Sequence, residues 1–232
     1  MDNESAGAEA RSATEQVIQF AERFGRPHLD LACHAAFPLV LTPEMLYQIW
    51  AAFVPHAPWT AVADVLLSSL CREIGYELYA MNPAVRNNLL RQLRANPDPA
   101  QAERRMRDLG YFLASYVAPL EDSEDAGERD LAGAQKLAAY VVLDPNLVLD
   151  NLIGHYSNIV EPNGEDRAAT FRLSSLVSNL AGSMGFTAQA EQYQALQIYA
   201  DGLKSLARGD REEAFLQLTH DTTDSRALTG GA

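Results

Sequence analysis

The sequence is poor in cysteine and lacks the short motifs of common catalytic and metal sites. Its only cysteines are Cys33 and Cys71, and so few thiols are typical of proteins in a reducing compartment. We therefore expect two free thiols and a cytoplasmic location, with a Cys33–Cys71 disulfide as the alternative. Phosphate loops of the G-x-x-x-x-G-K-S/T or G-x-G-x-x-G type, a G-x-S-x-G elbow, H-E-x-x-H and paired C-x-x-C motifs are absent. The sequence accordingly predicts no cofactor, no metal and no catalytic residue.

Long apolar runs and an excess of positive charge are also missing. No stretch approaches the roughly 20 apolar residues of a membrane span, and the start "MDNESAGAEARSATE" lacks the basic and apolar parts of a signal peptide. The net charge is −13, with 10 Lys/Arg and 13 Asp/Glu in residues 1–120 and 8 and 18 in residues 121–232. Because nucleic-acid binding requires cations that neutralise phosphates, we expect neither a nucleic acid nor a membrane as partner.

Most of the chain shows apolar residues at helical spacing, which predicts a mainly α fold. Hydrophobic residues make up 47% of the sequence, enough for a buried core. Ser12 and Glu15 form a capping-box pattern that predicts the first helix start, and Thr42 and Thr60 are expected to cap the helices that follow them. The predicted helices cover about 12–24, 28–36, 43–53, 61–70, 83–93, 100–117, 128–142, 145–160, 165–183, 187–207 and 210–219.

One segment departs from this pattern. In "REIGYELYAMN", Ile74, Tyr76 and Leu78 alternate with polar residues around a glycine, which predicts a minor β-hairpin. The order of helices, hairpin and helix is similar to a winged-helix arrangement. The segment "TAVADVLLSSLCRE" stands in the position of a recognition helix. It carries one basic residue, Arg72, two acidic residues, Asp64 and Glu73, and an apolar stripe, which do not suit DNA binding. We therefore expect this module to pack against protein, with a transcription regulator as an alternative.

Composition divides the chain into five segments. Residues 1–11 are predicted to be a disordered tail, and residues 12–119 a helical winged-helix-like module. An acidic linker at 120–127 then precedes a helical-hairpin domain at 128–220 and a disordered tail at 221–232. Within the second domain, residues 191–218 are similar to one tetratricopeptide-type hairpin, or else form a generic antiparallel helix pair.

The stretch "HLDLACHAAFPLVLTPEMLYQIW" gathers His28, Cys33 and His34 within seven positions. Six residues of helix leave the two histidines some 120° apart, so they do not share a face as metal ligands would. Cys33 falls on the apolar face, and Asp30 is placed to form an exposed ion pair with His34. The stretch therefore predicts helix packing. An enzyme of unrecognised class, using scattered carboxylates or a Cys71/His56 pair, is the alternative.

Three strings carry a resemblance to a known module: "HLDLACHAAFPLVLTPEMLYQIW", "PWTAVADVLLSSLCREIGYELYAM" and "AVRNNLLRQL". Together, over about residues 14–118, the chain resembles the N-terminal helical module of cyanobacterial-type multidomain signalling and conflict proteins. In those proteins the module stands beside signalling NTPase, caspase-like or propeller-repeat domains. The resemblance implies a role in bacterial signalling or defence and brings no catalytic motif. The second half of the chain lies outside it.

The function expected from these observations is that of a non-enzymatic adaptor or regulatory scaffold. Its partner would be another protein, such as a protease-like or signalling NTPase effector, or a second copy of the chain. Aromatic anchors and arginines dominate protein interfaces, so the candidate binding residues are Trp59, Tyr47, Phe53, Arg104 and Arg105. The arginine-rich segment 86–107 is expected to face solvent, an acidic partner or the acidic half of this chain.

Overall fold

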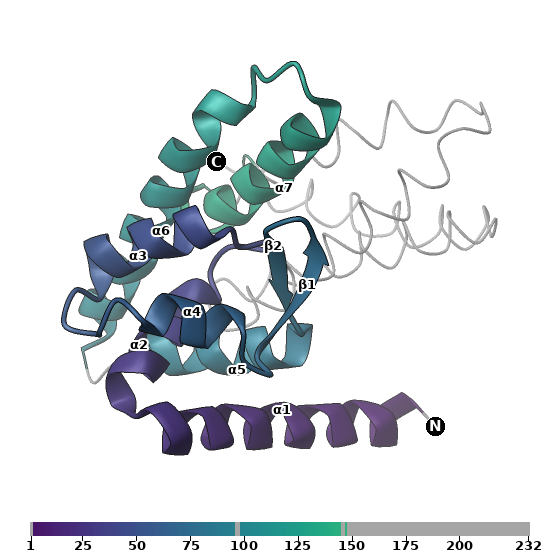
Figure 1. Ribbon diagram of the computed structural model, residues 1–232, viewed down its shortest axis with the longest axis vertical. Helices are drawn as coiled ribbons and strands as arrows, with labels where there is room; N and C mark the ends of the chain where they lie inside the picture. Colours follow the sequence, from purple (N-terminus) through teal and green to yellow (C-terminus); the bar gives the residue numbers. More distant parts are fainter. Residues whose placement is uncertain (1, 96–97, 145–146, 148–232) are drawn as a thin grey trace, which may run out of the picture. The chain divides into compact units, whose positions relative to one another are not determined.

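The computed structural model describes residues 2–95, 98–144 and 147, and the chain divides into two compact units, 1–143 and 144–232. The first unit is helical with one two-stranded antiparallel sheet, which confirms the predicted mainly α class with a minor hairpin (Figure 1). Its elements are α1 (Asp2–Phe24), α2 (Arg26–Ala35), α3 (Pro43–Phe53), α4 (Ala61–Leu66), β1 (Cys71–Gly75), β2 (Leu78–Met81), α5 (Pro83–Arg94), α6 (Pro99–Val117), the 3-10 turn η1 (Ala118–Leu120) and α7 (Ala126–Leu143). The helices predicted within residues 148–219, the hairpin at 191–218 and the tail at 221–232 lie outside the described residues.

The first helix begins earlier than the sequence pattern indicated. α1 starts at Asp2, so the predicted helix start at Ser12 is wrong. The added turns contain alanine, glutamate and arginine, which favour helix even where no core is available. Arg11 Nε donates to the carbonyl of Gly7 at 3.1 Å, a contact within one helical turn. The buried face of α1 begins at Ala13, which explains why apolar periodicity locates only its C-terminal half.

Side-chain caps explain where several helices begin. Thr42 Oγ1 accepts from the Met45 N–H at 3.0 Å, as predicted. Asn82 and Asp98 cap α5 and α6 in the same way. The Thr60 side chain makes no capping bond, so that expectation is wrong; its carbonyl instead accepts from Asp64 N at 3.0 Å. The largest fully buried side chains of the unit come from α2, α3, α5, α6 and the segments between helices: Leu31, Leu41, Leu46, Ile49, Leu70, Leu89, Leu90, Leu109 and Leu113.

The sheet is the predicted hairpin extended by a single bridge. β1 and β2 pair antiparallel, with Arg72 opposite Ala80 and Glu73 opposite Tyr79. Tyr79 also bridges Leu41, whose N–H donates to the Tyr79 carbonyl at 2.8 Å and whose carbonyl accepts in return at 2.9 Å. The described order is therefore α1, α2, the bridge at Leu41, α3, α4 and the hairpin, so that α4 directly precedes β1.

Helix α7 belongs to the first unit, so the segment 120–127 is a turn within that unit and not the predicted linker between domains. The segment is ordered by its own acids and hydroxyls, for example Ser123, which donates to the Glu128 carboxylate. α7 then packs along α6, where Gly110 allows a close approach: a Cβ there would lie 3.0 Å from Leu143 Cγ. Gln135 joins α7 to the segment between α2 and α3. None of the described helices is both long and apolar enough for a membrane span.

Candidate functional site

The stretch with His28, Cys33 and His34 is mainly packing, as expected. Cys33 is buried and lies on the core side of α2. His34 is also buried, so the predicted exposed ion pair with Asp30 is wrong. The His34 ring bonds through Nδ1 to the backbone carbonyl of Asp30 at 2.6 Å. The Asp30 carboxylate instead faces Arg26 at 2.8 Å and His56 at 3.5 Å.

The two cysteines are free thiols in apolar surroundings. Burial raises the pKa of Cys33 to about 12, and it raises the pKa of Cys71 to about 12 as well. Because the thiolate is the nucleophile and the metal ligand, both side chains are protonated and weakly reactive near neutral pH. Among the described residues there is no group of three or more His, Cys, Asp or Glu side chains that could hold a metal ion.

The predicted partner-binding residues occupy different environments. Trp59 and Tyr47 are exposed, with 65% and 51% of their surface accessible. Phe53 is half-buried and packs between the rings of His34, at 5.8 Å, and Phe112, at 5.7 Å. Of the predicted aromatic anchors, Trp59 and Tyr47 are therefore the ones with a large free surface, whereas Phe53 takes part in the packing of α3 on α6.

The two arginines on α6 also differ. Arg104 is exposed and its Nε donates to the carbonyl of Ala100, within the same helix. Arg105 is half-buried, and its charge is one of the factors that lower the pKa of His34, after burial itself. Arg105 is thus near enough to His34 of α2 to act on its charge, while Arg104 faces solvent.

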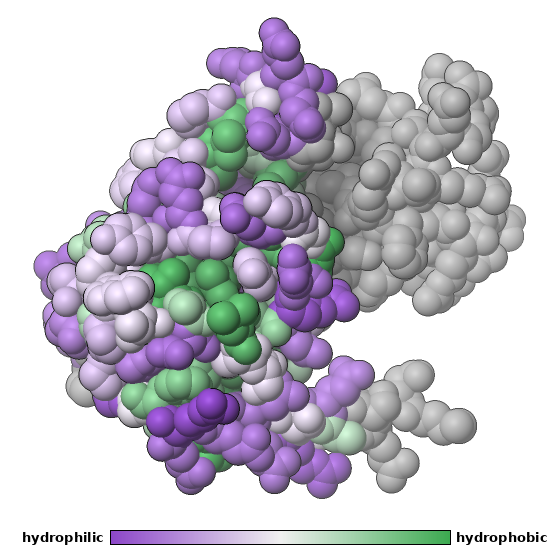
Figure 2. Space-filling view, in the orientation of Figure 1, coloured by the Kyte–Doolittle hydropathy of each residue, from purple (hydrophilic) through white to green (hydrophobic). Residues whose placement is uncertain are grey.

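An apolar ridge runs along the exposed side of α4. We define it as Trp59, which lies in the turn before α4, Ala63 on the exposed side of the helix, and Leu67 at its C-cap. Leu67 is 77% exposed. Figure 2 shows hydrophobic surface over α4 in the middle of this face, with hydrophilic surface along α1 below it. Leu67 was not among the predicted binding residues. The run Val65-Leu66-Leu67 is nevertheless a signal for an exposed apolar residue, because three successive helical positions cannot all face one core.

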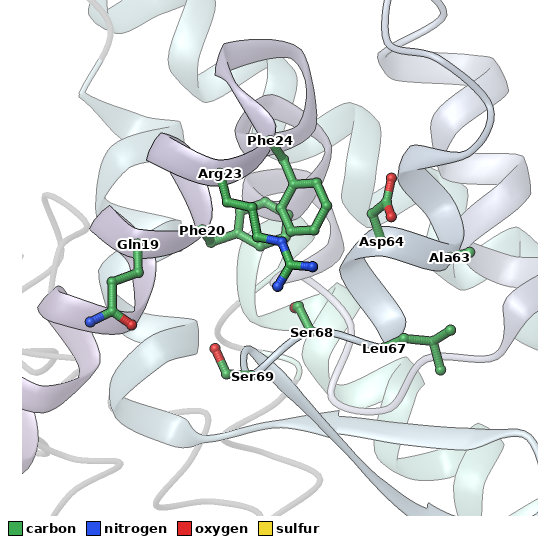
Figure 3. A pocket seen from close by; sticks show the side chains of 9 residues that line it. All are labelled: Gln19, Phe20, Arg23, Phe24, Ala63, Asp64, Leu67, Ser68 and Ser69. Carbon is green, nitrogen blue, oxygen red and sulfur yellow. The ribbon is translucent and has the colours of Figure 1, made fainter.

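A groove of about 390 Å³ separates this ridge from α1. It exists because α1 packs on α2 and α5, not closely on α4. Figure 3 shows its lining, which comes from two helices and the turn after α4: Gln19, Phe20, Arg23, Phe24, Ala63, Asp64, Leu67, Ser68 and Ser69. The groove thus has aromatic rings from α1 on one side, the exposed Leu67 on the other, and a few polar groups.

The two charged side chains that line this α1–α4 groove, Asp64 and Arg23, make different kinds of contact. Asp64 Oδ2 lies 3.1 Å from His28 Nε2, and the His28 ring is stacked on Phe24 at 5.5 Å. Arg23 lies with its Cζ 5.0 Å from the centre of the Phe24 ring, a cation–π contact. No ion pair of Arg23 with a carboxylate occurs among the residues that the structure describes.

Comparison with known proteins gives no assignment: no family model, curated protein or solved structure matches this chain.

Proposed function

We propose that this chain is a non-enzymatic adaptor or regulatory scaffold that binds a protein partner through the ridge on α4. The observation that carries the proposal is the exposure of Trp59 and Leu67 at the two ends of α4, together with the α1–α4 groove that Leu67 lines. Large apolar side chains gathered next to a concave surface are typical of protein-binding sites. A tryptophan supplies much of the binding energy where it enters a pocket of the partner.

The charge and shape of α4 favour a protein over DNA as the partner. A recognition helix presents basic and hydrogen-bonding side chains to the major groove. α4 presents Ala63 and Leu67 instead, and its charged residue is the acidic Asp64. This supports the adaptor over a transcription regulator.

The state of the thiols favours binding over cysteine chemistry. A nucleophilic cysteine needs a lowered pKa and access to solvent. Cys71, the cysteine of the Cys71/His56 alternative, has its pKa raised to about 12 by burial. The resemblance of residues 14–118 to a signalling and conflict module adds the expected setting, a cytoplasmic assembly with a protease-like or signalling NTPase effector.

Site-specific photocrosslinking tests this proposal. The full chain carries a photoreactive phenylalanine analogue in place of Trp59, and in a control in place of Tyr111, an aromatic residue of α6 that is 62% exposed. After irradiation in cells of the source organism, we expect a defined protein adduct from position 59 and not from position 111. An adduct with a second copy of the chain would assign the ridge to homo-oligomerisation. Equal labelling from both positions, or none from position 59, would refute the proposal.

A further inference from the structure

We draw no further inference here: the strongest candidate, the α1–α4 groove with the exposed Leu67 at its edge, is lined by the Asp64 carboxylate as well as by Arg23, and nothing in the structure shows what covers its apolar surface.

Discussion

Gln135 offers the most direct test of how α7 is attached to the first unit. Its side chain is 1% exposed, and its Oε1 accepts from the Leu39 N–H at 2.8 Å. Its Nε2 donates to the carbonyl of Val40. One amide side chain thus satisfies two successive backbone groups between α2 and α3, almost a hundred residues earlier in the chain. Gln135→Ala removes both bonds and leaves these backbone groups without that partner.

The cost of Gln135→Ala follows from the environment of the two backbone groups. A buried polar group that loses its partner costs about 1–3 kcal/mol. Leu39 and Val40 are half-buried, so water would partly replace the amide and the lower part of that range applies, about 1–1.5 kcal/mol for each group. The lost burial of one methylene, about 0.8 kcal/mol, is offset by a gain in side-chain entropy of at least that size. The expected loss in unfolding free energy is therefore about 2–3 kcal/mol.

Urea unfolding followed by tryptophan fluorescence reports on the unit 1–143, which contains Gln135. Trp50 and Trp59, the only tryptophans of the sequence, both lie within that unit. Amide hydrogen exchange of Leu39 should accelerate in the same variant. The matched control is Gln48→Ala, whose amide makes one exposed bond to Glu44 at 3.3 Å and should cost less than about 0.5 kcal/mol. A loss below about 0.5 kcal/mol for Gln135→Ala would refute the account of how α7 is held.

Three further predictions concern the packing and titration of the same unit. Gly133→Ala should raise the unfolding free energy by about 0.5–1 kcal/mol, because a Cβ there meets nothing within 4 Å. Gly110→Ala should not raise the stability measured by thermal unfolding, because its Cβ would lie 3.3 Å from the Ala139 carbonyl oxygen. Both cysteines should react slowly with a disulfide reagent at pH 7.5 and at once after unfolding, because burial raises each pKa to about 12; a fast native thiol would contradict this. Burial lowers the pKa of His34 below its usual 6.5, so the unfolded chain binds the proton more readily and stability should fall as the pH drops below about 6.5. His34→Gln should reduce that slope in pH-dependent urea unfolding, and an unchanged slope would show that His34 is not responsible.

Local patterns in the sequence were sufficient for much of the fold. The cap at Thr42, the hairpin around Gly75 and the core position of Cys33 all depend on neighbours within about one or two turns. The exposure of Trp59 and Tyr47 was likewise compatible with their places in a loop and on an outer helix face. These features follow from hydrogen-bond partners and periodicities that a short segment contains within itself.

Contacts between distant segments decided the rest. Asp30 and His34 are correctly spaced for an ion pair, but His34 is covered by Phe53 and Asp30 turns to His56, so burial overrides spacing. The acidic segment 120–127 resembles a linker in composition, and only the packing of α7 on α6 makes it a turn within the unit.

The candidate binding surface likewise depends in part on the local sequence and in part on contacts between distant segments. The sequence by itself determined that α4 is apolar and almost uncharged, because its residue types are fixed whatever surrounds them, whereas the structure ends the helix at Leu66, before the predicted end at about residue 70. The tertiary structure decided that α1 packs against α2 and α5, which leaves Leu67 exposed and leaves a groove between α1 and α4. An apolar residue becomes a surface feature only when the elements that might cover it pack elsewhere, and that outcome depends on the whole core.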